Sequence, residues 1–348
     1  MPEPLGEFAR IRALVAGLPG GDGVIVGPGD DAAVLRARDG VDLVVTTDTF
    51  VEGRHFRREL LSPTEAGARF AAANLSDLAA MAARPRWAVL ALVLPDTWSP
   101  AAVQAFEQSC AQALAADGAT IVGGNLASGP VFAATLTLIG EVTRGAAWLR
   151  AGARADDLVV VTGVPGSAGA FTALAMWASP PSREAVPTPL VERFVSPASR
   201  VSFATALAPL GAVHAAIDLS DGLTADLAHV LEASGVGAVL EAARWPADEA
   251  LWAASRRLSA WAGQERGPLP APERGVLDHW VTGPSDDYEL LLAVDPAQLE
   301  RAQALASEHR VPFTVIGRFT AEVGLRLESG GATAPFVPRG WDHFAAPE

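Results

Sequence analysis

The sequence of 348 residues contains no lysine, so all 26 of its basic residues are arginine. This absence excludes a Schiff-base lysine, a pyridoxal-phosphate site and the lysine of a P-loop. If the chain handles phosphate, it has to use arginine, backbone N–H groups or metal ions.

Cysteine is almost as scarce, because Cys110 is the only one and lies in a segment predicted to be helical. A single cysteine excludes a disulfide framework and a cysteine-based zinc site. We interpret Cys110 as a small buried apolar side chain. The histidines form no H-E-x-x-H pattern, so a zinc site of that kind is excluded as well.

Long hydrophobic runs are also missing, since no stretch of about 18 uncharged apolar residues occurs, and this excludes a transmembrane helix. The N-terminal segment carries charges throughout and lacks the basic and apolar regions of a signal peptide. The net charge of −14 argues against general nucleic-acid binding. The sequence therefore predicts a soluble cytoplasmic protein that binds neither membrane nor nucleic acid.

Half of the residues are hydrophobic, which is enough for a sizeable core, and strand and helix signals alternate along the whole chain. In the first half, Ser62, Pro63 and Glu65 predict a capping box at a helix start. The helices predicted there span 62–83 and 99–118, and the strands 23–27, 32–37, 42–48, 86–95, 119–124 and 131–142.

Charge and glycine interrupt the apolar pattern at 143–157, so we predict two domains, 1–145 and 150–348. The second half resumes with strands at 158–163, 212–218, 237–241, 287–294, 312–319 and 323–329. Helices are predicted at 167–178, in the segment before Pro209, at 223–235, from near Pro246 and at 296–309, whereas 263–279 is predicted to be a loop excursion. The fold class is α/β in both halves.

Acidic residues cluster at strand ends and in one helix, at Asp30 and Asp31, Asp48, Asp77, and Asp218 with Asp221. Any one of these is as readily a turn or a helix cap. Asp77 differs, because it is the only charge between Arg69 and Arg84 in an otherwise apolar helix, where an unpaired carboxylate is costly. Together the clusters supply hard oxygen ligands that suit Mg²⁺ bridged to phosphates, and we expect them to converge on one metal-filled cleft.

Several longer motifs then occur in a fixed order, from "GPGDDAAVL" at 27–35 through "TTDTFVEGRHF", "NLSDLAAMAARP", "IVGGN", "AIDLSDGLTADL" and "DDYELLLAV" to "GWDHF" at 340–344. With these motifs the sequence resembles the thiamine-monophosphate kinase family, from about residue 5 to residue 344. That family is part of the aminoimidazole-ribonucleotide-synthetase-like superfamily.

The resemblance implies a two-domain α/β protein, with an N-terminal mixed sheet that dimerises and a C-terminal α/β sandwich domain. It implies ATP-dependent phosphorylation of thiamine monophosphate to thiamine diphosphate, in thiamine biosynthesis, by direct in-line transfer assisted by several Mg²⁺ ions. The partners it implies are ATP, thiamine monophosphate and a second copy of the chain.

The resemblance also implies roles for single residues, and it assigns no catalytic acid or base. The metal ligands it implies are Asp31, Thr46, Thr47, Asp48, Asp77, Asn125, Asp218 and Asp221. The ATP contacts are Gly124, Asn125, Arg150 and Ser220, and the substrate contacts are His55, Glu289 and Trp341.

The sequence departs from the family pattern at two places. The family reads Gly-Gly-Asp-Thr-Thr-Arg-Gly where this chain reads "GGNLASG", so Asn125 replaces a metal-binding aspartate. The Gly-Gly-Glu that often precedes "DDYEL" is also changed, to "GPS". The alternatives are therefore another ATP-using enzyme of the superfamily, a cation-dependent phosphatase on the same carboxylates, or a degenerate metal-binding paralogue.

Overall fold

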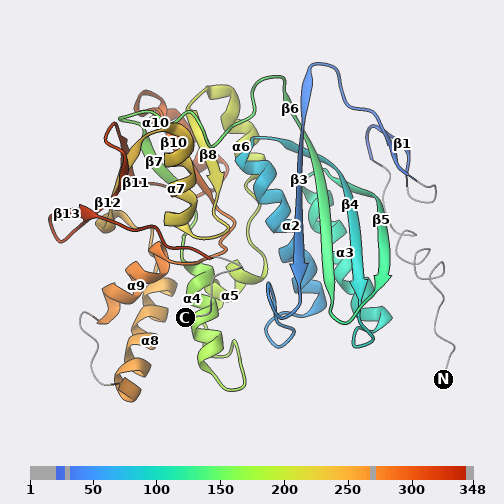
Figure 1. The fold of residues 1–348 in the computed structure, drawn as a ribbon, viewed down its shortest axis with the longest axis horizontal. Helices are drawn as coiled ribbons and strands as arrows, with labels where there is room; N and C mark the ends of the chain where they lie inside the picture. The colour runs from blue at the N-terminus through green and yellow to red at the C-terminus, as the bar shows by residue number, and fades with distance from the viewer. Residues whose placement is uncertain (1–20, 28–31, 267–271, 342–348) are drawn as a thin grey trace. The chain divides into compact units, whose positions relative to one another are not determined.

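The computed structural model describes residues 21–27, 32–266 and 272–341, without the side chains of 261–272. The chain divides into two compact units (Figure 1). Unit 1 comprises Met1–Leu78 and Ala82–Ala147, and unit 2 comprises Ala79–Met81 and Trp148–Glu348. Both units combine sheets with helices, so the predicted α/β class is confirmed.

Unit 1 is built on a four-stranded sheet in the order β3-β6-β4-β5. β4 and β5 are parallel and the other pairs are antiparallel, so the sheet is mixed, as predicted. A separate two-stranded pairing joins β1 to β2. The elements are β1 (Val24–Val26), β2 (Val34–Leu35), β3 (Val41–Val51), α2 (Pro63–Ala80), β4 (Arg84–Leu94), α3 (Pro100–Ala116), β5 (Thr120–Ser128) and β6 (Ala133–Thr143).

Helix α2 begins at the predicted capping box. The Glu65 carboxylate accepts hydrogen bonds from the Ser62 backbone N–H and hydroxyl, at 2.8 and 2.9 Å, so the prediction is confirmed. α2 packs closely on α3, because a Cβ added to Gly67 would lie 2.1 Å from the Phe106 carbonyl oxygen. It also packs on the sheet, where a Cβ added to Gly140 would lie 2.9 Å from Leu78 Cδ1.

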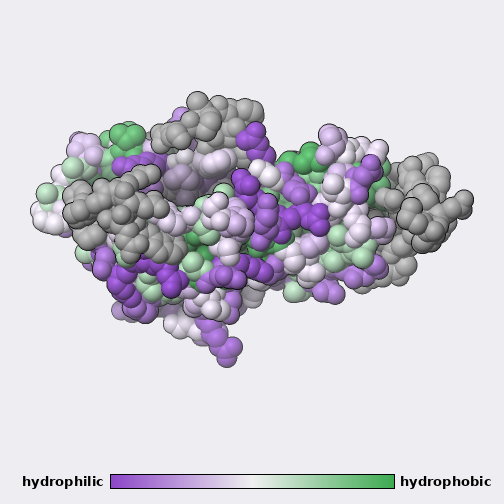
Figure 2. Space-filling view, turned by 90° about the horizontal axis from the view of Figure 1, so that it is seen from below, coloured by the Kyte–Doolittle hydropathy of each residue, from purple (hydrophilic) through white to green (hydrophobic). Residues whose placement is uncertain are grey.

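The opposite face of this sheet carries exposed apolar side chains. Leu43, Val45 and Val89 are 51%, 60% and 37% exposed. Further along the same face, the hydroxyls of Thr47 and Thr137 lie 3.1 Å apart in a cross-strand pair. Elsewhere, the face of the molecule shown in Figure 2 has hydrophobic residues only in small areas among hydrophilic ones.

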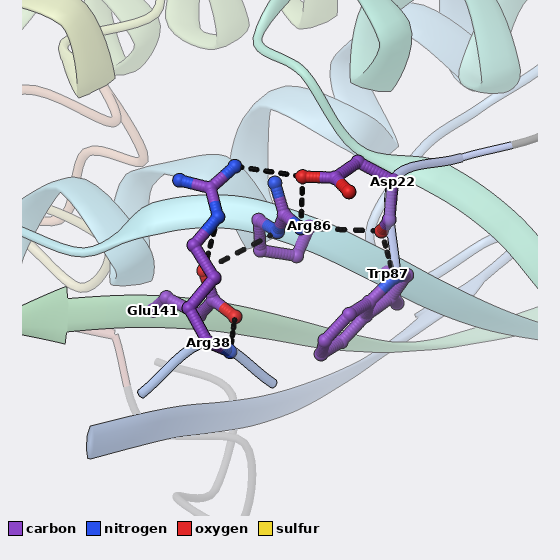
Figure 3. A network of polar contacts seen from close by, with 5 residues as sticks. All are labelled: Asp22, Arg38, Arg86, Trp87 and Glu141. Atoms are coloured by element: carbon purple, nitrogen blue, oxygen red, sulfur yellow. Dashed lines mark hydrogen bonds and ion pairs between the residues drawn. The ribbon is translucent and has the colours of Figure 1, made fainter. Parts of the chain in front are cut away.

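An ionic network ties the segment around β1 and β2 to the sheet of unit 1 (Figure 3). Arg38 and Arg86 both donate to the Asp22 carboxylate, at 2.8 and 2.9 Å, and these bonds lower the pKa of Asp22. The Nε atoms of the two arginines lie 3.7 and 3.4 Å from Glu141 Oε2. Trp87 Nε1 donates to the Asp22 carbonyl at 3.0 Å, which fixes the backbone of the segment as well.

Unit 2 contains a seven-stranded sheet in the order β13-β12-β9-β11-β7-β10-β8. β9 and β12 are parallel, and every other pair in the sheet is antiparallel. The strands are β7 (Leu158–Thr162), β8 (Val213–Asp218), β9 (Gly237–Glu241), β10 (Leu290–Val294), β11 (Phe313–Thr320), β12 (Gly324–Ser329) and β13 (Ala332–Pro335). The helices are α4 (Ser167–Trp177), α5 (Thr188–Val195), α6 (Val201–Leu207), η1 (Ala208–Leu210), α7 (Leu223–Ser234), η2 (Ala242–Arg244), α8 (Glu249–Arg266), α9 (Pro272–Thr282), η3 (Pro296–Gln298) and α10 (Leu299–Glu308).

Two segments of unit 2 differ from the prediction. The prediction of a loop at 263–279 is wrong, because α8 continues to Arg266 and α9 begins at Pro272. Leu277, Trp280 and Val281 of α9 are all less than 5% exposed, so burial of an apolar face favours the helix over the glycine- and proline-rich composition. β13 is not predicted at all, and it pairs with β12 across Gly330 and Gly331, which both have positive φ.

No helix within the described part of the chain is long and apolar enough to cross a membrane.

Candidate functional site: paired carboxylates in unit 1 and an acidic loop in unit 2

In unit 1, the structure brings together Thr46, Asp48 and Asp77. Thr46 and Asp48 are two residues apart on β3, so their side chains share one face of the sheet. The Thr46 hydroxyl donates to Asp77 Oδ2 of α2 at 2.5 Å. All three side chains are half-buried, so this cluster lies between the strand and the helix that covers it.

The surroundings of Asp48 make a negative charge on its carboxyl group unfavourable. Burial, and then the charge of Asp77, raise the pKa of Asp48 to about 6. A cation bound here would offset both effects, and two carboxylates with a hydroxyl are the hard oxygen donors that Mg²⁺ prefers. The donor set of unit 1 therefore fits a magnesium ion.

Within the residues that the structure describes, no three His, Cys, Asp or Glu side chains are grouped closely enough to hold a metal ion alone. Asp31, the further ligand implied by the resemblance, lies outside the described residues. The Thr47 hydroxyl does not join Thr46, because it lies on the opposite face, where it pairs with Thr137. Water or phosphate oxygens would complete the coordination, as is usual for Mg²⁺.

Gly124 and Asn125 lie on β5, at the edge of the sheet opposite to β3. The register aligns Asp48 with Leu136, Leu136 with Leu90, and Leu90 with Gly124. Three strand steps separate the two edges, which is about 14 Å. One chain therefore cannot bring Asp48 and Asn125 to the same ion.

Gly124 also has a packing reason to be glycine. An added Cβ would lie 2.0 Å from the Leu90 carbonyl oxygen of the neighbouring strand. This close approach excludes any larger residue whether or not a nucleotide binds here.

His55 follows β3 in a turn of unit 1. Its Nδ1 accepts the Val51 backbone N–H at 3.0 Å, so the ring proton is assigned to Nε2. The ring lies 5.9 Å from that of Phe50 and is half-buried. His55 is therefore held in one orientation by its own turn.

In unit 2, Asp218 ends β8 and is 5% exposed. The chain continues to pair with the next strand, since the Leu219 N–H donates to the Glu289 carbonyl at 2.8 Å. Asp221 lies in the loop before α7, and its carbonyl accepts the Trp341 N–H at 3.0 Å. The structure thus brings the acidic loop and Trp341 together through the backbone, while the Trp341 side chain is 52% exposed.

Asp226 is a residue of this loop region that the sequence analysis missed. Its Oδ2 accepts the backbone N–H groups of Ser220, Asp221 and Gly222, at 3.1, 3.2 and 3.0 Å. Burial raises the pKa of Asp226 to about 7, although the three N–H bonds act in the opposite direction. The available signal was a third aspartate in "DLSDGLTADL", one helical turn after the glycine.

Glu289 has a different setting from the one expected of a substrate contact. Arg200 Nε and Nη2 donate to its two carboxylate oxygens at 2.6 and 2.5 Å, and the Thr162 hydroxyl donates at 2.5 Å. Both members of the Arg200–Glu289 pair are 9% exposed. The carboxylate is thus neutralised inside unit 2, and Arg200 is a second residue that the sequence analysis missed.

Arg150 lies near the start of unit 2 with its side chain exposed. Its carbonyl accepts the Ser234 hydroxyl at 3.1 Å, which fixes the backbone at the end of α7. Among the contacts of the described residues, none engages its guanidinium, so that group is available to pair with a phosphate.

The sequence matches two family models over most of its length. "AIR synthase related protein, N-terminal domain" matches residues 29–142, and "AIR synthase related protein, C-terminal domain" matches residues 154–329. A thiamine-monophosphate kinase of Salmonella typhimurium is 34% identical over 325 residues, which cover 93% of this chain and 93% of the relative.

Solved structures agree with this finding. The crystal structure of thiamine-monophosphate kinase from Stenotrophomonas maltophilia is 33% identical, with a TM-score of 0.76 and coverage of 93% of this chain and 96% of the other. The structure of AaThiL complexed with AMPPCP and TMP is 26% identical, with a TM-score of 0.71 and 89% of each chain covered. On these similarities, this chain belongs to the thiamine-monophosphate kinase family of AIR synthase related proteins.

Proposed function

We propose that this protein transfers the γ-phosphoryl group of ATP to thiamine monophosphate and so forms thiamine diphosphate. The similarity over nearly the whole chain to a protein that was solved with AMPPCP and TMP carries this proposal. The carboxylate pair of unit 1 supports it, because its donor set fits the cation that such a nucleotide-dependent reaction needs.

The reaction needs no general base in this proposal. The second pKa of a phosphate monoester is about 6, so the acceptor is mostly dianionic near neutral pH. One of its oxygens forms the new bond to the γ-phosphorus while the bond from that phosphorus to the β,γ-bridging oxygen breaks, and ADP leaves. The protein then has to align two anions and neutralise their charge.

The residues divide this work between them. Asp48 and Asp77 in unit 1, and Asp218 and Asp221 in unit 2, would hold Mg²⁺, which neutralises phosphate oxygens when bound. The exposed guanidinium of Arg150 supplies fixed positive charge in a chain without lysine. Ser220 would contact ATP, and His55 and Trp341 would contact the substrate, for which an aromatic face suits the cationic thiazolium ring.

We further propose that the protein is a homodimer formed through the exposed face of the four-stranded sheet. Leu43, Val45 and Val89 give this face an apolar area that a second copy would cover. Asn125 at the far edge would then act at the site of the partner copy, since about 14 Å separates it from Asp48 within one chain. Sedimentation of the natural protein and of Val45→Arg tests this, with a monomer expected only for the variant.

The function is tested by supplying ATP and thiamine monophosphate and measuring thiamine diphosphate. In the controls, thiamine replaces thiamine monophosphate, or no acceptor other than water is present. A phosphatase or an unrelated ATPase would still consume ATP under these conditions. Transfer from ATP with a chiral γ-phosphate should invert the configuration at phosphorus. Retention of configuration, or ATP loss that is independent of thiamine monophosphate, would contradict the proposal.

A further inference from the structure

We infer that Asp226 is a positioning residue that makes the acidic loop of unit 2, residues 218–222, a cation site instead of a phosphate cradle. The inference rests on the proposed function only for the use of that cation. The observation behind it is that one carboxylate oxygen collects three consecutive backbone N–H groups, those of Ser220, Asp221 and Gly222.

Consecutive N–H groups that converge on one point form an anion-binding concavity, and loops of this kind before a helix commonly bind phosphate. Here the acceptor is supplied by the chain itself, from a carboxyl group that is 2% exposed. The donors of the loop are therefore consumed. The side chains of the loop carry the carboxylate oxygens of Asp218 and Asp221, and oxygens of this kind suit a cation.

The shape of the loop is fixed from the other side as well. Gly222 has a φ of 129°, and an added Cβ would lie 2.3 Å from the Gly283 carbonyl oxygen, so the loop cannot relax in that direction. Thr224, in the same first turn of α7, donates to the Thr282 carbonyl at 2.7 Å and accepts the Arg339 N–H at 2.9 Å. With these contacts in place, Asp226 determines which way the amides of the loop face.

The simpler interpretation is a helix cap. A capping carboxylate in the first turn of a helix normally accepts the N–H of the N-cap residue. Gly222 is the N-cap of α7, and its bond to Asp226 fits that role. The hydrogen bonds from the Ser220 and Asp221 N–H groups are not capping bonds of the helix, because both residues precede the N-cap. They fix the segment that carries the acidic ligands.

The experiment measures binding of Mn²⁺ alone, by electron paramagnetic resonance, to the full-length protein. An Asp48→Asn, Asp77→Asn background removes the carboxylates of unit 1, so that the loop of unit 2 is observed without turnover. Adding Asp226→Asn replaces the carboxylate with a weaker amide acceptor and should weaken Mn²⁺ binding about tenfold or more, as mutation of a residue that orients metal ligands typically does. Hydrogen exchange at residues 220–222 should become faster in the same variant.

Asp248→Asn is the matched control. The Asp248 carboxylate accepts the Leu251 N–H at 3.0 Å at the start of α8 and pairs with Arg193, and neither contact involves residues 218–222. This variant should lower the melting temperature and leave Mn²⁺ binding unchanged. Unchanged Mn²⁺ affinity in Asp226→Asn, with a similar loss of melting temperature, would show that Asp226 is only a cap.

Two further outcomes keep the inference separate from the proposed function. Mn²⁺ binding that depends on Asp226, in a protein that does not phosphorylate thiamine monophosphate, supports the inference and overturns only the function. Absence of Mn²⁺ binding in the background protein overturns the inference. If Asp226→Asn does not fold, Asp226→Glu is measured instead. Faster hydrogen exchange at residues 220–222 with unchanged Mn²⁺ affinity in that variant would contradict the inference.

Discussion

Two carboxylates of this protein accept a threonine hydroxyl at the same distance, 2.5 Å, but their surroundings differ in charge. In unit 2, Thr162 donates to Glu289, and Arg200 completes the group with two charged hydrogen bonds. In unit 1, Thr46 donates to Asp77, and the neighbour is a second carboxylate, Asp48, with a raised pKa. The first cluster is complete without a ligand, whereas an added cation would stabilise the second. Removing a negative charge should therefore have opposite effects in the two clusters.

The largest effect on stability is expected from Glu289→Gln, because it leaves the buried Arg200 guanidinium uncompensated. The free energy of unfolding should fall by about 3 to 5 kcal/mol, measured by urea unfolding. The double variant Glu289→Met, Arg200→Met is the control, and it should recover much of the loss. If Glu289→Gln retains its stability and only the KM for thiamine monophosphate rises, Glu289 is a substrate contact and the comparison fails.

The next effect is on turnover. Asp48→Asn should lower kcat/KM at least about 100-fold, equivalent to about 2.7 kcal/mol of transition-state stabilisation, because the charge that we propose to hold the metal ion is lost. Asp77→Asn should behave alike, and both proteins should fold. Steady-state kinetics at saturating Mg²⁺ check this, and full activity in either variant would assign the pair a purely structural role.

The same substitution should stabilise the metal-free protein. The pKa of Asp48 is raised to about 6 from 3.8, so between these values the folded state binds more protons than the unfolded chain. Stability from this site falls as pH rises through that window and stays low above it. In EDTA at about pH 8, Asp48→Asn should exceed the natural protein by on the order of 1 to 3 kcal/mol, with the difference shrinking toward about pH 4. Thermal unfolding at both pH values measures the sign, and a less stable variant at the higher pH would refute it.

The smallest effect concerns the two threonines. Thr162 also accepts the Leu290 N–H at 2.8 Å and is fully buried, so Thr162→Val should cost about 1 to 3 kcal/mol. Thr46 is half-buried, and Thr46→Val should cost about 1 kcal/mol or less. Equal losses in urea unfolding would mean that the clusters are more alike than their charges indicate.

Much of the fold follows from local patterns that the sequence displays. The capping box at Ser62 and the buried strand that became β4 are examples, since propensity and tertiary packing agree there. The prediction of a loop at 263–279 was wrong because it relied on the glycine and proline content of the segment. The buried apolar face of the helix is evident only from the packing of Trp280 and its neighbours. Local composition cannot show which helix a distant surface will bury.

The side-chain contacts within the candidate site were less predictable than the fold. The pairing of Thr46 with Asp77 joins residues 31 apart, and the Arg200–Glu289 pair joins residues 89 apart. Sequence spacing contains no information about such contacts. Asp226 was overlooked because its partners are backbone amides, which every sequence provides and none displays.

The strand order of unit 1 has a genetic consequence if Asn125 serves the partner copy. A chain with a substitution at Asp48 has lost a site residue on one edge strand, β3. A chain with a substitution at Asn125 has lost a site residue on the other edge strand, β5. In a mixed dimer both lesions fall on one site and the other site is whole. Two alleles that are each inactive should therefore complement one another when expressed in the same cell, whereas two alleles damaged at the same edge should not.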